Sequence, residues 1–105
     1  MFKFLKNIVN NPSITASEAQ QKVKKENCIL LDVREGFERK MNSIAGSLHI
    51  PVGQLKSRLN ELELHKEKEI IVYCATGSRS TMATAVLNSN GFNSINLLGG
   101  IGAYK

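Results

Sequence analysis

Two unbroken apolar runs constrain the fold of this chain more than any other feature. The first begins at Cys28 and ends in an acid, Asp32, followed by Val33. The second spans Ile70 to Cys74, and both are rich in Ile, Leu and Val. A strand that is apolar along its whole length is buried on both faces, which is typical of a parallel sheet. These runs therefore predict a sheet whose central strands are covered on both sides.

The segments around these runs alternate between strand and helix signals. A helix is predicted from Thr15 to about Lys25, because Thr15 and Glu18 have the spacing of a capping box. Further helices are predicted over 35–41, 54–62 and 80–90, with short strands over 13–15, 47–50 and 94–98. The apolar residues expected to face inward from the last two helices are Leu55, Leu59 and Leu62, and then Met82, Ala83, Val86 and Leu87. Alternating strands and helices predict a three-layer α/β fold with a mainly parallel sheet.

Length and charge narrow the class of protein. The 105 residues can form one hydrophobic core but not two. The net charge is +5, but the lysines are scattered rather than gathered in a stripe with aromatic residues, which argues against nucleic-acid binding. A mildly positive field favours small anionic partners, and it serves solubility equally well.

The first residues differ in character from the rest. Residues 1–12 form a short, basic, amphipathic segment, and residues 13–105 form the predicted domain. The segment lacks the uninterrupted apolar stretch of a secretory signal and is too short to span a membrane. We therefore expect a cytoplasmic protein, with the amino-terminal segment packed on the domain or docked on a surface or partner.

The two cysteines do not suggest a disulfide or a metal site. Cys28 begins one predicted strand whereas Cys74 ends another, so a bridge between them is not expected. The chain has no CxxC pair, which removes the usual dithiol and zinc-ribbon patterns, and no metal is predicted. Free thiols fit a reducing compartment. Cys28 is interpreted as a core thiol.

Cys74 stands where a reactive thiol is expected. It ends a strand and is followed by a short loop of small residues and then by a helix from about Ser80. Amide hydrogens of such a loop converge on one point, and the positive end of the helix dipole adds to their effect. Both lower the pKa of a thiol and stabilise a thiolate or a persulfide. Asp32 also ends a strand, so it faces the same crevice, whereas His49 and His65 are expected to be structural or exposed.

Five segments in order and spacing resemble the single-domain rhodaneses. They are Leu31 to Glu35 (LDVRE), Ile44 to Pro51 (IAGSLHIP), Ile71 to Ser80 (IVYCATGSRS), Gly91-Phe92 and Leu98 to Ile101 (LGGI). The resemblance runs from about Thr15 to the carboxyl terminus. It implies a five-stranded parallel sheet of order 3-2-4-5-1, flanked by helices. It departs from the family at Asn42-Ser43, where Gly-His is usual, and at Tyr104, where tryptophan is common.

The resemblance also implies a reaction. Cys74 carries sulfur as a persulfide between an anionic donor such as thiosulfate and an acceptor, cyanide or a thiol, without a metal or organic cofactor. The loop residues that cradle the persulfide are Ala75, Thr76, Gly77, Ser78 and Arg79. Arg79 either binds the anionic donor or holds the loop through backbone carbonyls. Asp32 and Arg34 are supporting residues, with Asp32 bracing the loop and Arg34 pairing with Glu38; donor contact through Arg34 is the minor alternative.

Two other functions stay open. One is a persulfide carrier or docking module that receives sulfur from a protein partner and has negligible turnover. The other is a small oxyanion phosphatase or arsenate reductase, whose loop has five residues between cysteine and arginine. Only four residues separate Cys74 from Arg79, and Ser80 stands at the phosphatase arginine position. The smaller ring favours sulfur transfer.

Overall fold

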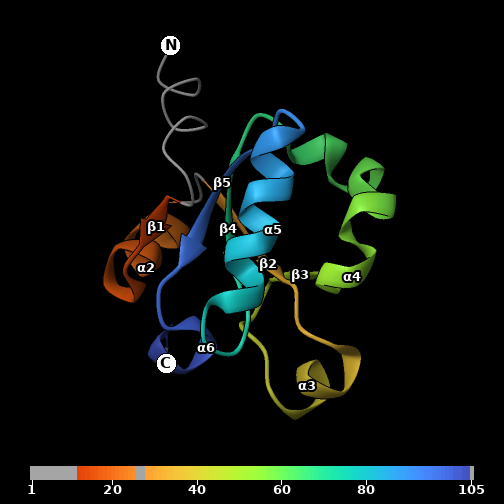
Figure 1. Ribbon diagram of the computed structural model, residues 1–105. Helices are drawn as coiled ribbons and strands as arrows, with labels where there is room; N and C mark the ends of the chain where they lie inside the picture. The colour runs from red at the N-terminus through yellow and green to blue at the C-terminus, as the bar shows by residue number, and fades with distance from the viewer. Residues whose placement is uncertain (1–11, 26–27, 105) are drawn as a thin grey trace.

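A parallel sheet forms the centre of the protein (Figure 1). The computed structural model describes residues 12–25 and 28–104, and across them the sheet has five strands in the order β1-β5-β4-β2-β3. The strands are β1 (Ser13–Ile14), β2 (Cys28–Asp32), β3 (Leu48–His49), β4 (Glu69–Tyr73) and β5 (Asn93–Leu97). Every neighbouring pair is parallel. Counted from the other edge, the order is 3-2-4-5-1, so the predicted sheet is confirmed.

The two apolar runs occupy the middle of the sheet. β2 pairs with β4 along its whole length, with Leu31 opposite Val72. Alternate side chains of β4 enter two separate cores, Ile71 and Tyr73 on one face and Val72 on the other. Burial on both faces explains why these strands are continuously apolar.

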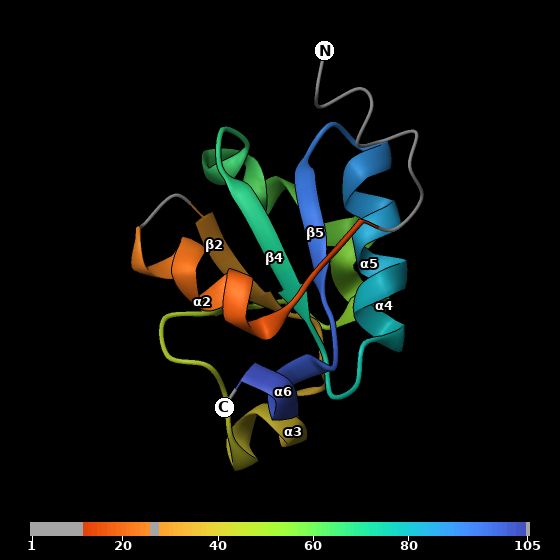
Figure 2. The same cartoon turned by 90° about the vertical axis from the view of Figure 1, so that its left-hand side faces the viewer.

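Helices cover both faces of the sheet (Figure 2). They are α2 (Ala16–Lys24), α3 (Gly36–Met41), α4 (Val52–Leu55), the 3₁₀ segment η1 (Lys56–His65), α5 (Ser78–Ser89) and α6 (Gly100–Tyr104). α2 and α6 share one core with the sheet, and α4, η1 and α5 share the other. The short helix α3 lies at the end of the molecule where the strands finish, close to the start of α5 (Figure 1).

Local signals place several helix boundaries correctly. The Glu18 amide donates to Thr15 Oγ1 at 3.2 Å, and the Glu18 carboxylate accepts from the Thr15 amide at 3.1 Å, so the predicted capping box is confirmed. The predicted helix over 54–62 is instead divided between α4 and η1. α4 ends at Leu55 and η1 begins at Lys56, and a kink inside η1 lies at Arg58, whose φ and ψ of −119° and 18° are not helical. Leu55 and Leu62 are buried as expected.

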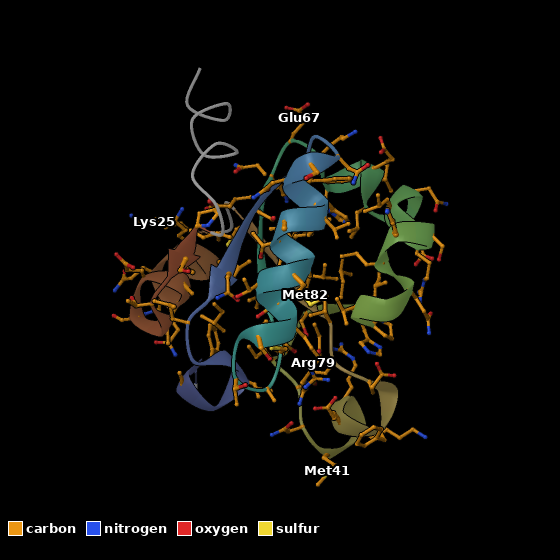
Figure 3. All side chains as sticks on the ribbon, in the orientation of Figure 1. Lys25, Met41, Glu67, Arg79 and Met82 are labelled. Carbon is orange, nitrogen blue, oxygen red and sulfur yellow. The ribbon has the colours of Figure 1, made fainter. Side chains whose placement is uncertain are left out.

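The prediction that Met82 faces the core is wrong. Met82 lies on α5 (Figure 3) and is 64% exposed, although Ala83 and Leu87 of the same helix are fully buried. The buried face of α5 also includes two hydroxyl residues, Ser80 and Thr84. Positions 80, 83, 84 and 87 form one helical stripe, and Met82 lies outside it. The buried face of α5 therefore includes polar residues that have hydrogen-bond partners inside the protein. Apolar periodicity alone does not detect them, so it assigned Met82 to the buried face.

The predicted amino-terminal segment lies outside the described residues except for Pro12. The carbonyl of Pro12 accepts a hydrogen bond from the Asn96 amide at 2.9 Å, which extends the pairing of β1 with β5. Within the described part of the chain, no helix is long and apolar enough to cross a membrane.

Candidate active site

Cys74 directly follows β4, at the carboxyl edge of the sheet. Its side chain is fully buried in the core between the sheet and α5. The chain then turns through three residues, and α5 begins at Ser78, two residues earlier than predicted. Gly77 immediately precedes the helix with a φ of 120°, in the region that favours glycine. This turn brings the start of α5 back over the sulfur.

Hydrogen bonds from the loop and helix surround the sulfur. The Gly77 amide donates to Cys74 Sγ at 3.0 Å, and Ser80 Oγ lies 3.4 Å from the same atom. Burial by itself raises the pKa of the Cys74 thiol. Hydrogen bonds from the Ser80 side chain and from the amides of Ser80, Gly77 and Thr76 outweigh it, so the pKa is lowered. The predicted convergence of amides on this sulfur is present.

Ser80 and Asn96 form a buried polar pair that the sequence reasoning did not assign to the site. Ser80 Oγ donates to Asn96 Oδ1 and to the Gly77 carbonyl, the latter at 3.1 Å. A hydroxyl has one hydrogen to donate, so these two acceptors and the sulfur share it. Both residues are buried. The available signal was Asn96 itself, a polar residue between the apolar Ile95 and Leu97 of β5.

The Gly99-Gly100 turn packs against the backbone of the loop that follows Cys74. The Ile101 amide donates to the Cys74 carbonyl at 3.0 Å. Gly100 has a φ of 66°, and a Cβ at this position would lie 2.2 Å from the carbonyl oxygen of Ala75. Only glycine lets the turn pack this close to the loop. The sequence indicated a turn here but not its contact with the loop.

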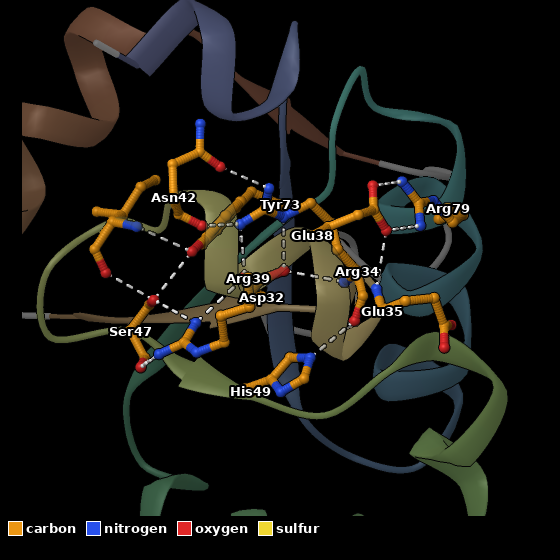
Figure 4. A network of polar contacts seen from close by, with 11 residues as sticks. Asp32, Arg34, Glu35, Glu38, Arg39, Asn42, Ser47, His49, Tyr73 and Arg79 are labelled. Carbon is orange, nitrogen blue, oxygen red and sulfur yellow. Dashed lines mark hydrogen bonds and ion pairs between the residues drawn. The ribbon is translucent and has the colours of Figure 1, made fainter.

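Arg79 is held by a carboxylate of α3 (Figure 4). Its Nη1 and Nη2 atoms donate to the two carboxylate oxygens of Glu38 at 2.7 and 2.9 Å. The hydrogen bonds from Arg79 and from the Glu35 amide lower the pKa of Glu38 to about 2, and the same ion pair raises the pKa of Arg79. The predicted pairing of Glu38 with Arg34 is therefore wrong, since Glu38 is joined to Arg79 of the Cys74 loop instead.

Arg34 pairs with Asp32, beside the loop rather than in it. Asp32 Oδ1 accepts from the Arg34 amide at 2.9 Å and from Nε at 3.1 Å, and Oδ2 accepts from Nη2 at 3.0 Å. Arg39 Nη1 donates to Asp32 Oδ2 at 3.2 Å. Burial raises the pKa of Asp32, but these hydrogen bonds outweigh it and the pKa is lowered. The hydrogen bonds found for this carboxylate among the described residues go to Arg34 and Arg39, so it does not brace residues 75–79 directly.

The same network ties α3 and the segment after it to the sheet (Figure 4). Arg34 donates to the side chain and the carbonyl of Asn42 at 3.0 and 2.8 Å, so one residue of the Asn42-Ser43 departure is part of this network. Arg39 donates to the carbonyl of Ser47 at 2.7 Å. His49 Nε2 is hydrogen-bonded to the Arg34 carbonyl at 2.8 Å, a structural contact as expected. Arg39 was not predicted to take part.

Cys28 has a different environment from Cys74. It begins β2 at the opposite edge of the sheet, and both thiols are free. Burial raises the pKa of Cys28, and the nearby Glu69 carboxylate raises it further. In residues 12–25 and 28–104, no three His, Cys, Asp or Glu side chains gather to hold a metal ion.

Comparisons with known proteins agree with this architecture. The family model of the Rhodanese-like domain matches residues 15–105. A crystal structure of a rhodanese-related protein from Thermoplasma volcanium superposes with a TM-score of 0.81 at 36% sequence identity, covering 89% of each chain.

Two curated relatives are longer than this chain. Over 85 residues the chain is 36% identical to a Bacillus subtilis protein, YrkF, whose name describes a sulfur carrier; the match covers 80% of this chain and 45% of that protein. Over 96 residues it is 29% identical to a tRNA uridine(34) hydroxylase of Buchnera aphidicola, covering 87% of this chain and 31% of that enzyme. The chain thus spans less than half of either relative. From its family match, its sheet and its loop, the chain belongs to the rhodanese-like domain family.

Proposed function

We propose that this protein is a sulfurtransferase that moves sulfane sulfur through a persulfide on Cys74. The donor is thiosulfate or a similar small anion, and the acceptor is cyanide or a thiol. The observation that carries the proposal is the Cys74 sulfur, which accepts a hydrogen bond from the Gly77 amide and has a lowered thiol pKa. The thiolate is the nucleophile that attack on a sulfane sulfur requires, and a lowered pKa increases the fraction of Cys74 in that form.

The reaction balances without a metal, a redox cofactor or a net proton transfer. The Cys74 thiolate attacks the outer sulfur of thiosulfate, a new S–S bond forms, and the S–S bond of thiosulfate breaks. Sulfite leaves with the bonding electron pair, and the negative charge of the thiolate passes to the terminal sulfur of the persulfide. Cyanide or a thiolate then attacks that terminal sulfur, so that thiocyanate or a new persulfide leaves and the Cys74 thiolate is restored.

The loop residues serve this reaction as a cradle for negative charge. The amides of Thr76, Gly77 and Ser80 lower the pKa of Cys74 and would stabilise the persulfide anion in the same way. The remaining cradle residues are Ala75, Ser78 and Arg79. The four residues between Cys74 and Arg79 make a ring smaller than that of the phosphatases, and Ser80 replaces the arginine that would hold a phosphate.

A second candidate is a persulfide carrier that takes sulfur from a protein donor and turns over small molecules negligibly. The name of the B. subtilis relative supports this alternative. In either role, two free cysteines support a reducing, cytoplasmic setting.

Intact mass and steady-state assays together test the proposal. After thiosulfate alone, the protein should gain one sulfur, about 32 Da. A Cys28→Ser variant should keep the gain, whereas a Cys74→Ser variant should lose it. Turnover with thiosulfate and cyanide supports the enzyme, whereas sulfur gain without turnover supports the carrier. Hydrolysis of phosphate esters with no sulfur gain would refute both.

A further inference from the structure

The three arginines around the catalytic loop all have carboxylate partners. Arg34 and Arg39 are bound to the buried Asp32. Arg79, the arginine of the loop itself, is bound to Glu38 through both carboxylate oxygens. Arg79 lies in the first turn of α5, and its charge interacts with the Cys74 sulfur. It is thus the cation best placed to receive an anionic donor, but its guanidinium is occupied.

Glu38 is fixed in position independently of Arg79. Its Oε1 atom also accepts a hydrogen bond from the Glu35 amide at 2.9 Å, at the start of α3. The next residue, Arg39, anchors α3 to the Ser47 carbonyl and to Asp32. The carboxylate therefore does not need to be ordered before it binds Arg79, so the pair loses little conformational entropy on forming.

The ion pair is accessible to a competing anion. The side chain of Arg79 is 31% exposed and that of Glu38 is 19% exposed. The pKa of Glu38 is about 2, so the carboxylate stays charged at ordinary pH and protonation does not release Arg79. An anion that approaches Cys74 must displace Glu38 to gain the full guanidinium contact.

We propose that Glu38 is a specificity-determining residue that competes with anionic sulfur donors for Arg79. The competition lowers the affinity of the site for small dianions such as thiosulfate. It leaves unchanged the affinity for persulfide donors that carry no further anionic group. This inference rests on the proposed sulfur transfer and adds to it the class of donor that the site selects.

Glu38→Gln is the variant that tests the competition. Its amide oxygen can still accept the hydrogen bond from the Glu35 amide, but the charge that holds Arg79 is gone. We expect thiosulfate to bind about tenfold more tightly, the equivalent of about 1.4 kcal/mol. Binding is measured by calorimetric titration in a Cys74→Ser background, in which thiosulfate cannot react.

Glu35→Gln is the matched control. It removes the same charge from the start of the same helix, and its side-chain oxygen can still take part in the capping box of α3. Glu35 acts on Arg79 through its charge, whereas Glu38 also binds it by hydrogen bonds. We expect less than a twofold change in thiosulfate binding. The double variant E38Q/R79Q should lose the gain of E38Q. Should E38Q lose stability, Glu38→Asp keeps the charge but is one methylene shorter, and it should bind thiosulfate with intermediate affinity.

Turnover gives a second readout. With thiosulfate, KM should fall in E38Q, whereas KM for the persulfide of 2-mercaptoethanol should not change. Unchanged or weaker thiosulfate binding in E38Q would overturn the proposal and show that Glu38 only positions Arg79. An equal gain in E35Q would also overturn it, since only net charge would then matter. If Cys74 gains sulfur from no donor, the proposed function fails, while the titrations still decide whether Glu38 competes for Arg79.

Discussion

Ser80 Oγ lies 3.4 Å from Cys74 Sγ and donates to Asn96 Oδ1 from the same position. The serine comes from the first turn of α5 and the asparagine from β5. The hydroxyl therefore links the sulfur to the sheet, and it supplies the largest of the contributions that lower the pKa of the thiol.

Removing this hydroxyl should make the thiolate form of Cys74 less stable. In Ser80→Ala, we expect the pKa of Cys74 to rise and sulfur loading at neutral pH to slow about tenfold, the effect of losing one charge-assisted hydrogen bond. The measurement is the pH profile of loading by thiosulfate. Thr81→Ala is the control, because Thr81 Oγ1 donates to the Gly77 carbonyl at 2.7 Å and not to the sulfur. A similar profile in both variants would contradict the role assigned to Ser80.

The pKa values of the two thiols should differ from the ordinary cysteine value in opposite directions. The pKa of Cys74 is lowered by its hydrogen bonds despite burial, whereas burial raises that of Cys28. The thiolate absorbance of Cys28→Ser should therefore develop at lower pH than that of Cys74→Ser. Coincident titration curves would show that the loop does not activate Cys74.

A methyl group at Gly100 should disturb the loop that follows Cys74. In Gly100→Ala the new Cβ would meet the Ala75 carbonyl oxygen at 2.2 Å, and the φ of 66° disfavours alanine as well. We expect a loss of about 1–3 kcal/mol in the free energy of unfolding and a large loss of sulfur loading. Gly102→Ala, which meets no atom within 4 Å, should preserve both. Normal loading in G100A would mean that the turn does not shape the site.

The Tyr73 hydroxyl should contribute to stability rather than to chemistry. It accepts from the Ile44 amide at 3.1 Å and is hydrogen-bonded to Ser47 Oγ at 2.9 Å. Tyr73→Phe leaves the Ile44 amide without this acceptor, at a cost of about 1–3 kcal/mol in the free energy of unfolding. Denaturant unfolding measures the change. Tyr104→Phe, at a partly exposed position, should change it by less than about 0.5 kcal/mol. Equal effects would count against the buried network.

Acid should remove the contribution of the Glu38–Arg79 ion pair. The folded pKa of Glu38 is about 2, below its ordinary value of 4.5. A carboxylate whose pKa is lower in the folded than in the unfolded protein stabilises the fold. This contribution is fully present above the unfolded pKa and is lost as pH falls toward the folded pKa. Unfolding measured between about pH 5 and pH 2 should therefore show a smaller loss in Glu38→Gln than in the unaltered protein. Parallel curves would contradict the assignment.

Continuous apolar strands and short-range caps made much of the fold predictable. The runs at β2 and β4 identified a sheet buried on both faces, and Thr15 with Glu18 identified the start of α2. Apolar periodicity failed at Met82, because buried hydroxyls of Ser80 and Thr84 occupy part of the inner stripe of α5. A pattern that counts only apolar residues cannot see polar groups that are satisfied inside the core.

The sequence by itself determined the fold class, the family and the position of Cys74, because strand burial, capping and loop spacing depend on residues near one another in the chain. Only the tertiary structure decided the partners of the charged and polar groups. Glu38 pairs with Arg79, forty-one positions away, and Ser80 meets Asn96 across the helix–sheet interface. A charged side chain can pair with any opposite charge that folding brings within reach, so sequence spacing favoured the nearer Arg34. The fold brings α3 close to the start of α5, and Glu38 therefore pairs with Arg79.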